Sequence, residues 1–299
     1  MKRSKLVMVG NGMAGVRTIE ELLKIAPELY EITVFGAEPH PNYNRILLSP
    51  VLAGEQTLDE IVLNSWEWYE ENRIALHAGK KVVEVDRVRR VVRAEDGTEE
   101  EYDRLLLCTG SNPFILPVPG KDLPGVIAYR DIADTNAMIE ASRKYKKAIV
   151  IGGGLLGLEA ANGLMLRGMD VTVVHVMPWL MERQLDDVAG KLLQKSLEDR
   201  GLKFMIGANT QELVAGESGR VQAVKFKDGT VVEADLVVMA VGIRPNTELA
   251  EKMKLHVNRG IVVHDTMQTV TDARIYSVGE CAAHRGIAYG LVAPLFEQA

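Results

Sequence analysis

Two glycine-rich loops are the strongest candidates for chemistry in this chain. The first, Gly10-Asn11-Gly12-Met13-Ala14-Gly15, joins a short apolar run to a stretch with apolar residues at helical spacing. Three glycines at this spacing allow a tight turn, a close approach of the backbone to a pyrophosphate, and close packing of the helix on the strand. The start of the helix adds N–H donors and the positive end of the helix dipole. Glu38, placed after the next strand, has a carboxylate that can accept both hydroxyls of a ribose.

The second loop is Gly152-Gly153-Gly154-Leu155-Leu156-Gly157, again between an apolar run and a helical pattern. Two such loops predict two bound dinucleotides. After the second loop the next strand ends in His175, where an acid is expected for the 2′-hydroxyl of NAD, and no arginine for the 2′-phosphate of NADP stands there. The choice between NAD and NADP therefore stays open. His175 is either a nucleotide contact or a histidine satisfied by the protein.

The elements around each loop follow one plan. A strand, a glycine turn, a helix and a second strand are predicted over residues 5–35 and again over 148–174. Each unit precedes a meander with an Asp-Gly hairpin turn, at Asp96-Gly97 and Asp228-Gly229, and then a buried strand. A capping box formed by Thr57 and Glu60 predicts a further helix over residues 61–69. Because one plan of roughly 140 residues is used twice, the chain contains an internal repeat.

The fold class follows from this repeat. It is α/β, with two doubly wound, Rossmann-like dinucleotide-binding domains, the second inserted in the first, each carrying a β-meander. The proline-rich stretch 113–124 forbids a continuing helix or strand and sets a boundary there. We expect the first part of one domain over residues 1–114, the inserted domain over 115–244, and the return to the first domain over 245–299.

Composition excludes several classes of protein. Apolar residues make up 47% and charged residues 25%, with a mean hydropathy of zero, as in a soluble globular protein. The net charge of -6 argues against a nucleic-acid surface. No apolar run approaches the ~18 residues of a membrane span, and no signal-peptide core is present. Two cysteines far apart, Cys108 and Cys281, form no metal-ligand spacing, so a cytoplasmic protein without a metal site or membrane partner is expected.

Three further motifs occur in order after the loops: Thr109-Gly110, Gly242-Ile243-Arg244-Pro245, and a late segment over residues 275–282 that contains Gly279 and Glu280. Together with the loops they resemble the pyridine nucleotide-disulfide oxidoreductase superfamily over essentially the whole chain. The resemblance implies FAD on the first loop and NADH or NADPH on the second. It places Glu280 at the ribityl chain, where members usually have aspartate.

The electron acceptor is indicated by the segment after the first strand-helix-strand unit. Disulfide and peroxide reductases of the superfamily carry cysteine there, whereas residues 42–49 contain no sulfur, so thiol chemistry is nearly excluded. Residues 35–45 with Leu48-Ser49, and residues 180–186, look like the N-terminal flavin module of the large subunit of assimilatory NAD(P)H nitrite reductase. By this resemblance Asn44 and Arg45 contact FAD, Arg45 at the pyrophosphate, and Glu159 lies near the nicotinamide. Arg45 could equally be a surface arginine, and Glu159 an acid on a helix face.

The resemblance implies an FAD-dependent NAD(P)H oxidoreductase module that passes electrons to a metal centre outside the chain. The acceptor is then an iron-sulfur and sirohaem domain or a small redox protein. Rubredoxin and ferredoxin reductases are an alternative, although Pro50 stands where those proteins carry lysine. A non-catalytic flavin-binding or assembly module is a second alternative. No acid-base residue is assigned. The chain stops at Ala299, within an expected helix, which predicts a fragment without the C-terminal interface domain.

Overall fold

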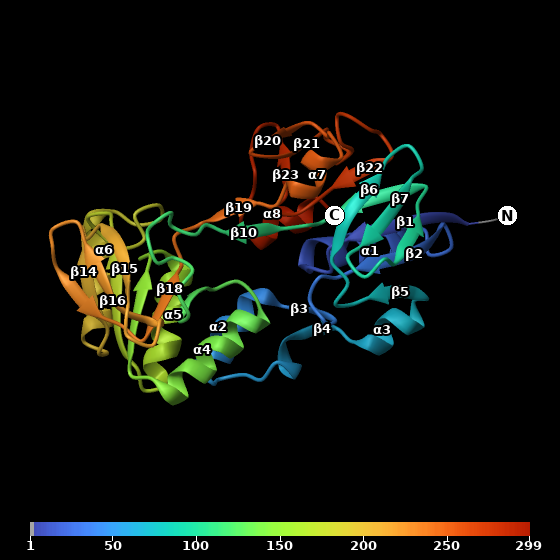
Figure 1. The fold of residues 1–299 in the computed structure, drawn as a ribbon. Helices are drawn as coiled ribbons and strands as arrows, with labels where there is room; N and C mark the ends of the chain where they lie inside the picture. The colour runs from blue at the N-terminus through green and yellow to red at the C-terminus, as the bar shows by residue number, and fades with distance from the viewer. Residues whose placement is uncertain (1–2) are drawn as a thin grey trace. The chain divides into compact units, whose positions relative to one another are not determined.

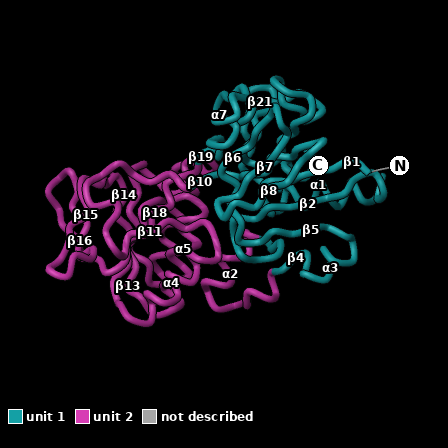
Figure 2. The backbone as a smooth tube through the Cα atoms, turned by 45° about the vertical axis from the view of Figure 1, so that its right-hand side comes forward, with its two compact units in different colours: residues 1–44, 62–112, 244–299 teal, residues 45–61, 113–243 magenta. Residues whose placement is uncertain are grey.

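The computed structural model describes residues 3–299, which divide into two compact units. Unit 1 holds the residues up to Asn44 together with Val62–Asn112 and Arg244–Ala299. Unit 2 holds Arg45–Ile61 and Pro113–Ile243. Figure 2 colours unit 1 teal and unit 2 magenta. Compared with the boundaries expected from the sequence, unit 2 additionally contains residues 45–61.

A five-stranded parallel sheet forms the centre of unit 1, in the order β22-β9-β1-β2-β5 (Figure 1). Its strands are the apolar runs that the sequence predicts to be buried. Strands of a parallel sheet are apolar throughout because both faces of the sheet are covered. Val9, the last residue of β1, pairs with Phe35 on one side and Leu107 on the other, so three strands end at the same edge. The elements of this strand-helix plan are β1 Ser4–Val9, α1 Met13–Ile25, β2 Tyr30–Phe35, α3 Trp66–Glu71, β5 Ile74–His77, β9 Arg104–Leu107 and β22 Ile275–Ser277.

Smaller elements complete unit 1. The predicted meander is an antiparallel sheet in the order β6-β7-β8, and Gly97 at its hairpin has a φ of +86°. Two further small sheets join β20, β21 and β23, and β3 with β4. The bounds are β3 Asn42–Tyr43, β4 Val62–Asn64, β6 Val82–Asp86, β7 Val91–Ala94, β8 Glu99–Glu101, α7 Glu248–Lys252, β20 Val257–Asn258, β21 Gly260–Val263, β23 Ala282–His284 and α8 Val292–Glu297.

Unit 2 repeats the plan with a parallel sheet in the order β11-β18-β12-β13-β14 and a meander in the order β15-β16-β17. Ile151 at the end of β12 pairs with Val174 and with Met239. The bounds are η1 Arg45–Leu47, α2 Leu48–Ala53, η2 Asp59–Ile61, β11 Val126–Ala128, α4 Ile132–Lys144, β12 Lys147–Ile151, α5 Leu155–Leu166, β13 Asp170–His175, α6 Asp187–Glu198, β14 Lys203–Ile206, β15 Thr210–Ala215, β16 Val221–Phe226, β17 Val231–Glu233 and β18 Leu236–Met239. The chain passes between the units along β10 Ser111–Pro113 and β19 Ile243–Pro245.

These two sheets confirm the α/β class and the internal repeat. The helix expected over residues 61–69 is wrong in its first half, where the turn η2 ends and the strand β4 follows, whereas α3 makes residues 66–69 helical. The capping contact itself exists, since Glu60 accepts hydrogen bonds from the Thr57 backbone at 2.7 Å and hydroxyl at 3.0 Å. Pairing of β4 with β3 then takes the chain into an extended conformation. The local preference for a helix is outweighed here by pairing with a strand that lies nineteen or more residues earlier in the sequence.

Residues 45–61 belong to unit 2 because α2 packs on α5. Leu52 is fully buried, and a Cβ added at Gly163 of α5 would lie 2.7 Å from the Leu52 Cγ. The Arg167 guanidinium at the end of α5 donates to the carbonyl oxygens of Val51, at 3.0 Å, and Leu52. Those carbonyls lie in the last turn of α2, where a cation also favours the negative end of the helix dipole.

Candidate functional site

The glycines of the first loop divide into two kinds. Gly10 has a φ of +108°, and a Cβ there would lie 2.1 Å from the Cys108 carbonyl oxygen. A Cβ at Gly15 would lie 2.8 Å from the Met8 sulfur. These two positions therefore require glycine for packing of the fold itself. At Gly12, by contrast, a Cβ would meet no atom within 4 Å, so this glycine faces open space.

The second loop has the same division. Gly152 has a φ of +126°, and its Cβ would lie 2.2 Å from the Ala240 carbonyl oxygen. A Cβ at Gly157 would lie 2.0 Å from the Gly152 carbonyl oxygen. Gly154 again faces open space, with nothing within 4 Å of an added Cβ. An open glycine at the middle position is the cradle that lets backbone approach a pyrophosphate.

The helices after the loops are left without side-chain caps. Gly12 is the N-cap of α1 and Gly154 that of α5, and neither helix has a side-chain hydrogen bond at its cap. Two helices of unit 2 differ, because Asp131 caps α4 and Asp186 caps α6. Backbone donors at the starts of α1 and α5 are thus available for a phosphate. Both loops fit a dinucleotide, with Met13 and Ala14 following one open glycine and the exposed Leu155 and Leu156 following the other.

Side chains that sequence reasoning missed hold the first loop in place. The Tyr69 hydroxyl donates to the Asn11 side-chain oxygen at 2.7 Å, and the buried Asn42 side chain donates to the Asn11 backbone oxygen at 3.0 Å. Burial raises the pKa of Tyr69 to about 12, so it remains a donor. The predicted ribose acid Glu38 accepts the Tyr43 hydroxyl at 2.7 Å. Asn42 and Tyr43 lie within the segment quoted for the family resemblance, which is the sequence signal that could have identified them.

The later motifs meet the first loop within unit 1. A Cβ at Gly279 would lie 3.2 Å from the Ala14 Cβ, so the late motif packs directly on the loop. The Gly279 N–H donates to the Gln298 side chain at 2.9 Å, and Glu280 accepts the Ser111 hydroxyl at 2.7 Å.

The turn Thr109-Gly110 is fixed by Asn246, another residue not identified from the sequence. The Thr109 hydroxyl donates to the Asn246 carbonyl oxygen at 2.7 Å, and the Asn246 backbone N–H donates to the Gly110 carbonyl oxygen at 2.8 Å. Gly242, the remaining glycine of the predicted set, lies in unit 2 with a φ of +116° and accepts the Phe114 N–H at 2.9 Å. The expected contacts of these residues with FAD stay predictions.

Glu159 and Ser49 come together in unit 2. Ser49 donates to the Glu159 carboxylate at 2.7 Å, and the Tyr129 hydroxyl lies 3.3 Å from the Ser49 hydroxyl. Arg45 donates to the Arg130 carbonyl oxygen at 2.5 Å, while Asn44 ends the first segment of unit 1. The structure thus places a hydroxyl beside the acid predicted near the nicotinamide. The roles of Arg45 and Asn44 at FAD stay predictions.

Asp134, on the first turn of α4, gives a pH-dependent test of this region. Burial, with the charge of Asp131, raises the pKa of Asp134 to about 6. A raised carboxyl pKa means that the folded state binds the proton more tightly, so stability is lost as the pH rises from about 4 to about 6. We expect Asp134→Asn to raise the free energy of unfolding at pH 7 by ~1 kcal/mol, a value discounted for partial solvent exposure. Asparagine keeps an oxygen that can accept the Arg130 N–H, which Asp134 binds at 2.7 Å.

Urea unfolding of the parent and of Asp134→Asn at pH 4, 5, 6 and 7 measures the effect. The gain should fall steadily from pH 6 to pH 4, because the carboxyl is protonated in the folded state there and becomes increasingly protonated in the unfolded state. Asp187→Asn, which replaces an exposed carboxylate by an amide in the first turn of α6, is the matched control. A gain that is the same at all four pH values would contradict titration of Asp134 as the cause.

The two cysteines pack as small apolar side chains. Cys281 is 0% and Cys108 8% exposed, and both are free thiols. Burial raises the pKa of the Cys108 thiol well above its usual range, so the reactive thiolate is disfavoured. This environment is unlike that of a redox-active cysteine.

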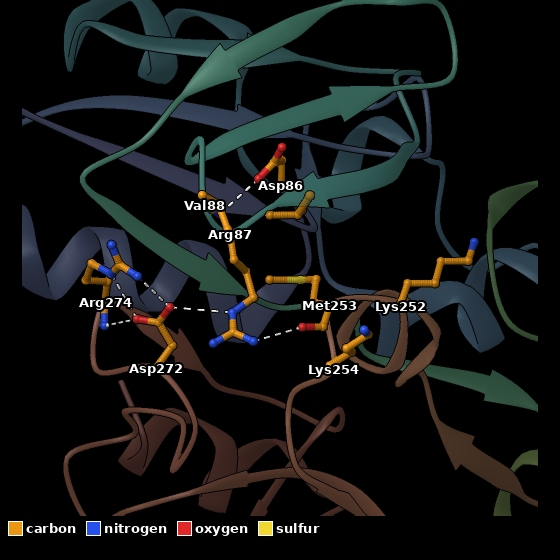
Figure 3. A pocket seen from close by; sticks show the side chains of 9 residues that line it. Asp86, Arg87, Val88, Lys252, Met253, Lys254, Asp272 and Arg274 are labelled. Atoms are coloured by element: carbon orange, nitrogen blue, oxygen red, sulfur yellow. Dashed lines mark hydrogen bonds and ion pairs between the residues drawn. The ribbon is translucent and has the colours of Figure 1, made fainter.

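A pocket of about 640 Å³ in unit 1 lies between the turn at residues 86–88 and segments 252–254 and 272–274 (Figure 3). It contains none of the predicted cofactor residues. Arg87 donates to the Met253 carbonyl oxygen at 3.0 Å, and its Nε lies 3.5 Å from the Asp272 carboxylate. Asp272 also accepts two hydrogen bonds from the Arg274 guanidinium, at 3.0 and 2.9 Å. The charged groups at the centre of this pocket therefore join three segments of unit 1.

Two parallel sheets, each with a glycine loop open to a phosphate at the carboxyl end of its central strand, β1 or β12, define a protein that binds two dinucleotides. Residues 4–294 match the family described as pyridine nucleotide-disulphide oxidoreductase. The chain belongs to this family, so it is an oxidoreductase module whose cofactors are FAD and a pyridine nucleotide.

Comparison with known proteins gives closely similar relatives. The chain is 59% identical, over its whole length, to nitrite reductase [NAD(P)H] of Bacillus subtilis (strain 168), of which it covers 37%. It is 50% identical to the assimilatory nitrate reductase electron transfer subunit of the same organism, of which it covers 38%. The chain thus spans less than two fifths of the length of these relatives.

Among solved structures, the covalent putidaredoxin reductase-putidaredoxin complex aligns with a TM-score of 0.92 and 30% identity, over 100% of this chain and 74% of that one.

Within residues 3–299, no helix has the length and apolar character that a membrane crossing requires.

Proposed function

We propose that this chain is the flavin module of an NAD(P)H-dependent nitrite reductase, passing electrons from NAD(P)H through FAD to a metal centre outside the chain. The single observation that carries the proposal is the pair of open glycines, Gly12 and Gly154, at two uncapped helix starts. We assign FAD to the loop of unit 1 and the pyridine nucleotide to that of unit 2. The identity of 59% with a nitrite reductase supports the destination of the electrons.

The residues of the chain bind and orient rather than perform acid-base chemistry. A bound FAD would supply the hydride-accepting and one-electron-releasing chemistry that the side chains lack. Around the proposed FAD loop, Tyr69 and Asn42 fix Asn11, and Tyr43 orients the Glu38 carboxylate for a ribose. In unit 2, Ser49 holds the Glu159 carboxylate in one orientation. Fixed geometry of this kind lowers the entropy lost on reaching the reactive arrangement.

Anaerobic reduction tests the proposal. The protein with FAD bound should lose its flavin absorbance near 450 nm when NADH or NADPH is added, and ferricyanide should restore it. Nitrite alone should not restore it, because the chain itself supplies no metal centre in this proposal. The same chain joined to an iron-sulfur and sirohaem domain should then reduce nitrite at the expense of the nucleotide. A flavin that neither nucleotide reduces would overturn the proposal and favour the non-catalytic binding module.

One observation favours a second candidate, a reductase for a small iron-sulfur protein. The putidaredoxin reductase structure covers all of this chain. In that case a rubredoxin or ferredoxin, added to the chain with NADPH or NADH, should be reduced in many turnovers. If no such protein is reduced while a joined sirohaem domain is, the nitrite reductase proposal is retained.

A further inference from the structure

The histidine at the end of β13 has no ring nitrogen left for a nucleotide. Its Nδ1 accepts the backbone N–H of Gly153 at 3.0 Å, within the glycine loop. An accepting Nδ1 in a neutral imidazole leaves the proton on Nε2. That Nε2 lies 3.1 Å from the carboxylate of Glu182. His175, 7% exposed, therefore links the loop to an acid seven residues further along the chain.

Glu182 is fixed beside the loop from a second direction. The N–H of Met181, the preceding residue, donates to the Gly153 carbonyl oxygen at 3.0 Å, and Met181 has a φ of +56°. Leu180 is fully buried, and a Cβ at Gly153 would lie 2.7 Å from its side chain and from the His175 ring. The Gly153 N–H is thus bound by His175 and the Gly153 carbonyl oxygen by Met181, the residue before Glu182. Glu182 lies in the turn segment between β13 and α6, which these contacts fasten to the glycine loop.

The Glu182 side chain can still accept further hydrogen bonds. It is 23% exposed, and His175 contacts its Oε2. A carboxylate has room for several hydrogen bonds, so one donor leaves the other oxygen available. The end of the second strand of a dinucleotide-binding fold is where the adenosine ribose lies and where a carboxylate selects a free 2′-hydroxyl.

We propose that Glu182, held by His175, replaces the missing strand-end acid and makes this module prefer NADH over NADPH. The inference rests on the proposed binding of a pyridine nucleotide at the loop of unit 2. The carboxylate accepts hydroxyls of the adenosine ribose, whereas a 2′-phosphate brings a second negative charge to the same place. His175 is a positioning residue, because it orients Glu182 and the loop without contacting the nucleotide.

The test compares nucleotides in Glu182→Gln. Glutamine keeps an oxygen that can accept the His175 proton, but it removes the negative charge. We expect the parent with FAD bound to bind NAD⁺ about tenfold or more tightly than NADP⁺, and the variant to lose most of that ratio. Titration calorimetry with NAD⁺ and NADP⁺ measures binding directly. The kcat/KM values for NADH and NADPH with ferricyanide should show the same change in ratio.

Glu217→Gln, at an exposed turn between β15 and β16, is the matched control and should leave the ratio unchanged. A merely structural role of Glu182 would weaken both nucleotides equally, which overturns the inference. A parent that prefers NADPH also overturns it, and Arg183→Ala would then show whether the neighbouring cation binds the 2′-phosphate. If the parent binds neither nucleotide, the proposed function fails instead, so the two failures are distinguishable.

Discussion

Gly154→Val is expected to leave FAD bound while lowering the rate of flavin reduction by NADH by a factor of about 100 or more. The added side chain would enter space that no protein atom occupies within 4 Å. The backbone of Gly154, with φ -85° and ψ -178°, is extended and suits a β-branched residue. The fold should therefore tolerate valine. Valine should instead weaken binding of the nucleotide, because its pyrophosphate requires a close approach of the backbone at this position.

Stopped-flow mixing with NADH under anaerobic conditions measures the loss, and the absorbance spectrum of the purified variant measures the bound FAD. Gly157→Ala provides the contrast, because its Cβ would lie 2.0 Å from the Gly152 carbonyl oxygen. That variant should melt at a lower temperature than the parent, whereas Gly154→Val should not. Flavin reduction by NADH at the parental rate in Gly154→Val would remove the second loop from the proposed mechanism.

The parts of the site that were predictable from the sequence are those that depend on neighbours in the chain. Gly10 and Gly15 could be placed because a strand, a turn and a helix in succession fix what each glycine must do. The same holds for Gly152 and Gly157, and both parallel sheets followed from the repeated apolar runs. The helix expected over 61–69 shows the limit of this reasoning. Its capping contact formed, yet pairing with residues 42–43 decided the conformation.

The remaining features depend on contacts that no local pattern encodes. The packing of Leu52 on Gly163, which joins α2 to α5, spans more than a hundred residues. The Ser49–Glu159 hydrogen bond does so as well, and Asn246 reaches back to Thr109. From the sequence, His175 is either a nucleotide contact or a histidine satisfied by the protein, because its position at the end of a strand is the only guide. Its two ring nitrogens are used by Gly153 and Glu182, which only the folded chain could reveal.

Gly12→Val is the prediction with the largest expected effect, since it should remove FAD itself. Gly12 has φ -84° and ψ 175°, and a Cβ there meets no protein atom within 4 Å, so valine fits the apoprotein. The loop cannot shift to make room for a pyrophosphate, because Tyr69 and Asn42 hold the adjacent Asn11 at 2.7 and 3.0 Å. We expect FAD affinity to fall by a factor of about 100 or more, which corresponds to ~3 kcal/mol.

The ratio of flavin to protein absorbance after purification gives the first measurement, and titration with FAD gives the second. Because a ligand that binds only the folded state stabilises it, the comparison of stability must use apoprotein. The Gly12→Val apoprotein should have the same melting temperature as the parent apoprotein. Added FAD should raise the melting temperature of the parent but not that of the variant. A variant that melts well below the apoprotein would point to a damaged fold. A variant that purifies with a full complement of FAD would instead place the flavin away from the loop of Gly10 to Gly15.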